Sequence, residues 1–68
     1  MSASNYVHID VEEILRETDA AFYVLLASGE ETWLPKSQIA DADDYNKGDK
    51  DCTLSITQWI ARQKGIEL

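Results

Sequence analysis

Carboxylates are the commonest reactive side chains in this sequence, and many of them fall in two short acidic runs. Closely spaced carboxylates can share a proton, bind a cation or attract a basic partner. The members of these runs that we select as candidates are Glu30, Glu31, Asp41, Asp43 and Asp44. None of them lies in a motif with a nucleophile or in a recognisable acid–base pair, so the sequence predicts no enzymatic activity. Their expected role is contact with a partner.

The sequence contains a single histidine, His8, and a single cysteine, Cys52. One chain therefore offers neither an internal disulfide nor the ligand set of a structural zinc site. His8 falls on the polar side of an alternating segment, and no motif supplies a base that would activate the Cys52 thiol. We expect no catalytic residue, no metal and no cofactor.

The segment 40–51, ADADDYNKGDKD, has the composition of an acidic loop and raises the question of a calcium site. An EF-hand loop needs oxygen ligands at its first, third and fifth positions, glycine at the sixth and glutamate at the twelfth. If Gly48 is placed sixth, Asp43 is first, but Tyr45 is then third and Leu54 twelfth. The spacing therefore favours an acidic loop over a specific calcium site.

The 68 residues include 13 acidic and 6 basic side chains, which gives a net charge of −7. Residues 1–51 hold 12 of the acids and 4 of the bases. Such a field repels phosphate backbones and disfavours nucleic acid as a ligand unless the few cations gather on one face. Basic protein surfaces are the more natural partners.

Length and composition bound the class of protein. With 44% hydrophobic and 28% charged residues, the chain is expected to form one globular domain over residues 1–68, with a flexible N-terminus at residues 1–5. It contains no signal-peptide pattern and no run of about 18 apolar residues that could span a bilayer. These features, together with the unpaired Cys52, predict a cytoplasmic protein without membrane contact.

Residues 6–11 alternate between apolar and polar side chains, which is the period of a half-buried strand. Residues 10–18 are open to two interpretations. They fit a helix capped by Asp10, or a continued strand whose bulge at Glu12 and Glu13 turns the even-numbered residues inward. The strand is favoured, because the helix would have barely two turns.

Residues 21–27, AFYVLLA, predict a central strand that is covered on both faces. A Ser-Gly turn joins it to a second strand over residues 31–34. Pro35 lacks an amide hydrogen and is therefore expected at a sheet edge or a strand end. The three residues after it suit a short 3₁₀ turn that returns Ile39 to the core.

A last strand is predicted over residues 52–56. It leads into a short helix that starts at Ser55, which has capping-box spacing to a following glutamine, and that ends before Gly65. Trp59 and Ile60 are expected to pack this helix onto the sheet. Start and stop signals for the helix agree with each other.

Together these elements predict a mainly β domain, a small SH3-like, partly open barrel of four to five strands with a short C-terminal helix. Barrel closure would remove the exposed edges that a chain of this length cannot cover otherwise. The alternative is an α+β fold in which residues 10–18 are helical.

The leading functional hypothesis is a non-enzymatic interaction module whose acidic surface binds a basic protein. That surface could also mimic phosphates in the groove of a nucleic-acid enzyme, or serve solubility alone. For Trp33 a core position is favoured over an exposed binding platform, and for Lys36 a solvated charge. The candidate contact residues are Glu30, Glu31, Trp33, Lys36, Asp41, Asp43, Asp44 and Tyr45.

The alternative hypothesis is a binder of single-stranded nucleic acid or of a small nucleotide, because small barrels can stack bases on exposed aromatic side chains. The candidate residues are the aromatics Tyr6, Tyr23, Trp33 and Tyr45 and the cations Arg16, Lys36 and Lys47. Three cations are few beside so many acids. A pocket at a homo-oligomer interface would be needed to shield the ligand from the acidic surface.

Three runs of the sequence carry a resemblance: ILRETDAAFYVLL, GEETWLPKSQI and LSITQWIARQKGI. Over residues 14–66 they resemble a family of small, mostly uncharacterised proteins encoded by bacteriophages and prophages. The family pattern has Glu-Thr and a charged pair, an apolar strand, Trp-x-Pro-Lys-Ser-Gln, and a terminal Trp-Leu-Ala helix that ends in Lys-Gly. This chain has Ala20 where the pattern has lysine. The resemblance implies an accessory phage protein that acts inside the host cell, and it transfers no catalytic residue.

Overall fold

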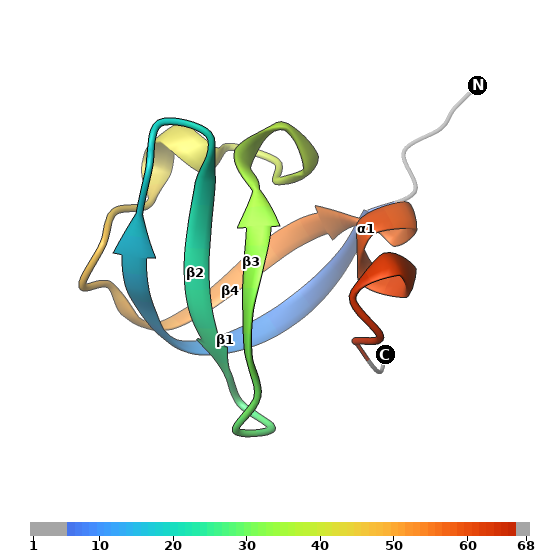
Figure 1. The fold of residues 1–68 in the computed structure, drawn as a ribbon, viewed down its shortest axis with the longest axis horizontal. Helices are drawn as coiled ribbons and strands as arrows, with labels where there is room; N and C mark the ends of the chain where they lie inside the picture. Colours follow the sequence, from blue (N-terminus) through green and yellow to red (C-terminus); the bar gives the residue numbers. More distant parts are fainter. Residues whose placement is uncertain (1–5, 67–68) are drawn as a thin grey trace.

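Four strands, two 3₁₀ turns and one α-helix follow one another along residues 6–66, the part of the chain that the computed structural model describes (Figure 1). The N-terminus that we expected to be flexible, residues 1–5, lies outside the described residues. The elements are β1 (Tyr6–Glu17), β2 (Ala21–Leu26), β3 (Glu31–Pro35), η1 (Lys36–Gln38), η2 (Ala42–Asp44), β4 (Lys50–Thr57) and α1 (Gln58–Gln63).

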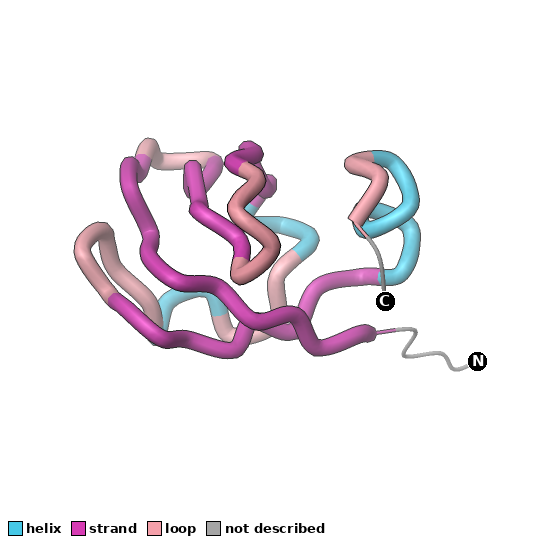
Figure 2. Tube along the Cα trace, turned by 90° about the horizontal axis from the view of Figure 1, so that it is seen from below, coloured by secondary structure: helices cyan, strands magenta, loops and turns pink. Residues whose placement is uncertain are grey.

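The strands form one antiparallel sheet in the order β3-β2-β1-β4. The mainly β prediction with a short C-terminal helix is confirmed, but the sheet is open. In the described part of the chain no strand pairing joins β3 to β4, as it would in a closed barrel. An isolated bridge between Ile39, which follows β3 and η1, and Ile56 of β4 is the contact that comes nearest to closing the sheet. Figure 2 shows how strongly the strands curve when the sheet is seen from below.

The long strand β1 serves both halves of the sheet. Its first part pairs with β4, and its second part pairs with β2 across a register shift between Val11 and Glu13. The predicted strand over residues 10–18 and its bulge are therefore confirmed, except that the strand ends at Glu17, and the helical alternative is wrong. Ile14 takes over the inward face after the bulge and is fully buried.

One face of the sheet carries the hydrophobic core. The core residues are Ile9, Val11, Ile14, Phe22, Val24, Leu26, Leu34, Ile39, Leu54, Ile56, Ile60 and Ala61. In β2 the even-numbered residues are buried, whereas Tyr23 and Leu25 on the opposite face are only half-buried. The prediction that this strand is covered on both faces is therefore wrong, and its outer face is partly open to solvent.

The β2–β3 hairpin and its exit follow the predicted turn chemistry. Gly29 has φ +96°, a conformation that residues with a side chain rarely adopt. The backbone conformation of the turn therefore explains why a glycine stands at this position. β3 ends with Pro35, and the 3₁₀ turn η1 follows it directly, as expected. Ile39 then returns to the core, with 5% of its surface exposed.

The terminal helix is shorter than predicted and begins later. Its N-cap is Thr57, whose Oγ1 accepts a hydrogen bond from the Ile60 amide at 3.2 Å, whereas Ser55 lies inside β4. Ile60 is buried, but Trp59 is 59% exposed, so the prediction that both pack onto the sheet is wrong for Trp59. The positive φ of Gly65 ends the helix as predicted. Among the described residues no helix is long and apolar enough to cross a membrane.

Candidate binding face

A row of three side chains crosses the outer face of the sheet. The strand register places Arg16 of β1 opposite Tyr23 of β2, and Tyr23 opposite Trp33 of β3. The rings of Tyr23 and Trp33 lie 4.9 Å apart between centroids at an interplanar angle of 45°. Trp33 is 39% exposed. The prediction that it lies in the core is therefore wrong, and its side chain is exposed, as in the alternative prediction.

A carboxylate fixes this aromatic pair. The Tyr23 hydroxyl donates a hydrogen bond of 2.8 Å to Glu31 Oε1, and this bond raises the pKa of Tyr23, with desolvation adding to it. Arg16, Tyr23, Glu31 and Trp33 together line a shallow hollow of about 340 Å³. We call these four residues, with the neighbouring half-buried Leu25, the aromatic face.

Cations gather beside the aromatic face. A second shallow hollow, of about 530 Å³, is lined by Trp33, Arg16 and Lys47 together with Leu15, Glu17 and Thr18. Two basic groups therefore share a hollow with the exposed indole. The charge at this place is more balanced than the net charge of the chain suggests.

Lys36 is engaged in contacts and is not the solvated charge that we expected. Its Nζ lies 2.7 Å from Glu17 Oε2 and 4.8 Å from the centre of the Phe22 ring. Glu17 also accepts a hydrogen bond of 3.1 Å from the Lys47 amide, which ties the loop before β4 to the end of β1. The hydrogen bond from Lys36, then that from Lys47, lower the pKa of Glu17.

The lowered pKa of Glu17 predicts a pH effect on stability. A carboxyl group whose pKa is depressed by folding stabilises the folded state above its unfolded pKa, and this stabilisation is lost as the pH falls through the folded pKa. Removal of this carboxylate in Glu17→Gln should therefore make stability less dependent on pH in the acidic range. Urea denaturation of both proteins between neutral and acidic pH measures the difference, with Glu12→Gln, at an exposed position of β1, as the control. If the free energy of unfolding changed in parallel with pH for wild type and Glu17→Gln, this prediction would be contradicted.

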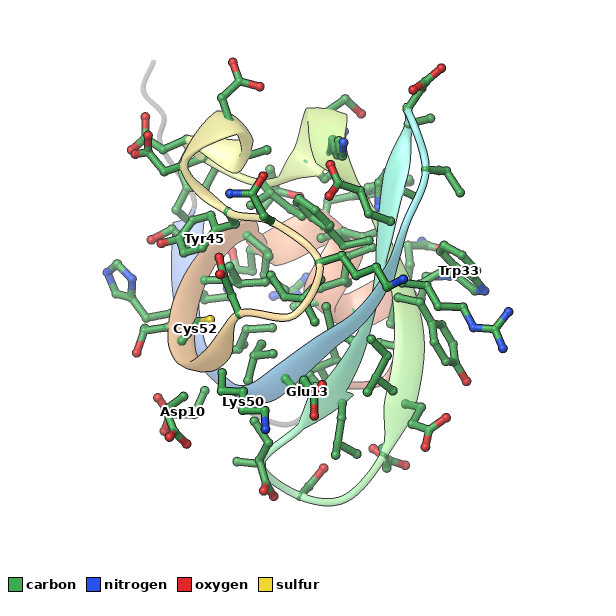
Figure 3. All side chains as sticks on the ribbon, turned by 90° about the vertical axis from the view of Figure 1, so that its left-hand side faces the viewer. Asp10, Glu13, Trp33, Tyr45, Lys50 and Cys52 are labelled. Atoms are coloured by element: carbon green, nitrogen blue, oxygen red, sulfur yellow. The ribbon has the colours of Figure 1, made fainter. Side chains whose placement is uncertain are left out.

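The structure divides the predicted contact residues into separate groups. Glu30, Glu31 and Trp33 lie in the β2–β3 hairpin, whereas Asp41, Asp43 and Asp44 lie at η2 near the opposite end of the sheet (Figure 1). Figure 3 likewise shows Trp33 and Tyr45 on different sides of the molecule. The predicted set therefore does not form one continuous surface.

Several residues of the segment 40–51 shape its backbone. Asp41 adopts the left-handed conformation at φ 56°, which aspartate tolerates better than most residues, and Asp49 accepts a hydrogen bond of 2.9 Å from the Asn46 amide. Tyr45 packs against the core, and its hydroxyl donates to the Thr53 carbonyl at 3.0 Å. The segment is thus partly ordered by its own side chains, and β4 begins within it at Lys50.

Cys52 and His8, the two residues with the strongest intrinsic reactivity, lie in surroundings that do not activate them. Burial, and then Asp49 and Asp51, raise the pKa of the half-buried Cys52 thiol, which disfavours the nucleophilic thiolate. His8 is exposed, and its Nδ1 lies 2.8 Å from Ser55 Oγ. Within residues 6–66 no group of three His, Cys, Asp or Glu side chains is arranged to hold a metal ion.

Sequence reasoning named most members of the aromatic face but did not place them together. Tyr23 was a candidate for base stacking, Arg16 for phosphate contact and Glu31 for protein contact, while Trp33 was a candidate for both stacking and protein contact. Their common signal is the strand register, because residues opposite one another on neighbouring strands share a face. The two β1 irregularities hide this register from simple alternation.

Comparison with known proteins adds no assignment to this geometry. The chain matches no protein-family model, no curated protein and no solved structure.

Proposed function

We propose that this protein is a non-catalytic interaction module that holds a protein partner on its aromatic face. The observation that carries the proposal is the pair of the half-buried Tyr23 and the exposed Trp33, which lies beside Arg16 on the outer face of the sheet. Tyrosine, tryptophan and arginine are the residue types that dominate binding energy at protein interfaces. These three residues form one continuous contact surface, whereas the acidic residues are scattered over the molecule.

Rigidity supports this role. The Tyr23 hydroxyl is fixed by Glu31, and both aromatic residues stand on paired strands of the sheet. Side chains that are already ordered lose little conformational entropy when a partner binds. Glu30 and Glu31 at the adjoining hairpin, and the net charge of −7, favour a partner with a basic surface.

The experiment compares two tryptophans that differ in their surroundings. Wild type, Trp33→Ala and Trp59→Ala are immobilised and exposed to bacterial lysate. Bacterial lysate is used because the resemblance to phage proteins implies a partner in a bacterial host. We expect one protein to be retained by wild type and Trp59→Ala and to be lost from Trp33→Ala. Equal retention by both variants would exclude the aromatic face as the docking surface. Circular dichroism of each variant checks that it is folded.

A second candidate function is the binding of single-stranded nucleic acid or a small nucleotide. Its support is the hollow that Trp33 shares with Arg16 and Lys47, since an exposed indole can stack a base while cations hold phosphate. Glu17 and Glu31 beside the same indole weaken this candidate. An oligothymidine titration at low salt tests it: binding that weakens with added salt and is lost in Trp33→Ala would favour it over a protein partner.

Two finer assignments belong with the proposal. The strongly curved sheet, its 3₁₀ turn after β3 and the Ile39–Ile56 bridge support an SH3-like, partly open barrel as the fold type. The role of an accessory phage protein in the host cytoplasm rests on the sequence resemblance. No catalytic, metal or cofactor role enters the proposal.

A further inference from the structure

We propose that the partner binds as an extra strand along the open edge of β3, through an extended segment that carries basic side chains. This inference rests on the proposed function, because it describes how the aromatic face would be reached. It assigns the backbone of β3, in addition to its side chains, to the binding site.

The register shows which backbone groups of β3 are free. The Leu26 amide donates to the Glu30 carbonyl at 2.7 Å, so the backbone groups of Glu30 point toward β2. Backbone groups of successive residues in a strand point to alternate sides. Those of Glu31 and Trp33 therefore point away from β2, and among the described residues no backbone hydrogen bond joins them to another element.

The free edge has two defined ends. At one end the chain turns at Gly29, and at the other Pro35 offers no amide hydrogen to a neighbouring strand. Between these ends Glu31 and Trp33 offer two amide donors and two carbonyl acceptors. A short extended segment could satisfy all four of these groups, as in peptide recognition by strand addition.

Charge selects the kind of segment. Glu30 and Glu31 are exposed at the hairpin end of this edge, and the Glu31 carboxylate is held on the outer face by Tyr23. A lysine or arginine opposite Glu31 would meet a fixed negative charge. A second copy of this chain would instead bring together two proteins of net charge −7, with glutamates at both edges.

The first measurement is amide hydrogen exchange by NMR on the whole protein. The Glu31 and Trp33 amides should exchange quickly in the free protein, while those of buried β2 are protected. Addition of a capped seven-residue peptide of alternating lysine and valine should slow exchange at Glu31 and Trp33. Protection of both amides in the free protein would overturn the inference, because another part of the chain, such as α1, or a second copy would already cover the edge.

Two substitutions at one position separate backbone from side chain. Glu31→Ala removes the carboxylate, and Glu31→Pro removes the carboxylate together with the outward amide hydrogen, at an edge position that tolerates proline. We expect the lysine–valine peptide to bind Glu31→Ala a few fold more weakly than wild type, and Glu31→Pro at least about tenfold more weakly than Glu31→Ala. NMR spectra check that both variants keep the fold.

The outcomes distinguish this inference from the function on which it rests. Equal affinity of Glu31→Ala and Glu31→Pro, with binding still lost in Trp33→Ala, would reject strand addition and keep the aromatic face as a docking surface. No binding of the peptide by wild type would also reject strand addition. Peptide binding that Trp33→Ala leaves intact would count against the proposed function while keeping the edge as a peptide site.

Discussion

Phe22→Ala should leave a large fraction of this protein unfolded at room temperature. Phe22 is fully buried in the core, and replacement of a buried phenylalanine by alanine typically costs about 3–5 kcal/mol. A single-core domain of this length has a free energy of unfolding of roughly 3–5 kcal/mol. The expected loss is therefore comparable to the whole stability.

The position of Phe22 adds to this effect. The Lys36 ammonium lies 4.8 Å from the centre of its ring while bridging to Glu17, so loss of the ring also removes a contact that orders the end of β3. A smaller cavity should give a graded result. Ile14→Val, at another fully buried position, is expected to cost about 0.5–1.5 kcal/mol and to leave the protein folded.

Urea denaturation followed by circular dichroism measures both effects. The matched control is Tyr23→Ala, which removes a large aromatic side chain from the next residue on the half-buried outer face. We expect Tyr23→Ala to remain folded. Similar losses of stability in Phe22→Ala and Tyr23→Ala would mean that the two faces of β2 are equally buried, contrary to the structure.

The fold was predictable from the sequence wherever the signal is local. Alternation identified β1 and β3, and a run of apolar residues identified β2. The change of inward residues at Glu12 and Glu13 identified the bulge, because a strand with a period of two cannot otherwise bury Ile14. Gly29 and Pro35 marked the ends of β3 through their own backbone restrictions. These features depend on residues close together in the chain.

What the sequence could not supply was the surroundings of individual side chains. Trp33 and Trp59 looked like core residues because tryptophan is largely apolar, yet exposure depends on whether another element covers that face. Lys36, directly after β3, meets Glu17 at the end of β1, a pairing between residues 19 apart in sequence. The helix start was misplaced because β4 extends past Ser55 through pairing with β1, which overrides a local capping signal.

The candidate site was predictable as a set of residue types but not as a place. Net charge directed attention to the acids, and these are split between the hairpin and η2. The aromatic face depends on two irregularities in β1 that bring Arg16 into line with Tyr23. No periodicity rule applied to one strand at a time gives that alignment.

Ile60→Ala should destabilise the protein far more than Trp59→Ala, although tryptophan is the larger side chain. Ile60 is 4% exposed and belongs to the core, and substitution of a buried isoleucine by alanine typically costs about 2–5 kcal/mol. Trp59 is 59% exposed, and surface substitutions usually change stability by about 0.5 kcal/mol or less. Thermal and urea denaturation of the two variants measures the difference.

The comparison of Ile60→Ala with Trp59→Ala shows which side chain holds the terminal helix on the sheet. α1 has six residues, too few to be stable by its own hydrogen bonds, so its order must come from the buried Ile60 and Ala61 and from the Thr57 cap. Loss of Ile60 should therefore release the helix as well as weaken the core, which amide exchange of the Lys64 and Ile66 amides can detect, since both bond back to the helix. If Trp59→Ala proved as destabilising as Ile60→Ala, the exposed indole would have to contact the sheet, and the docking described for α1 would be incorrect.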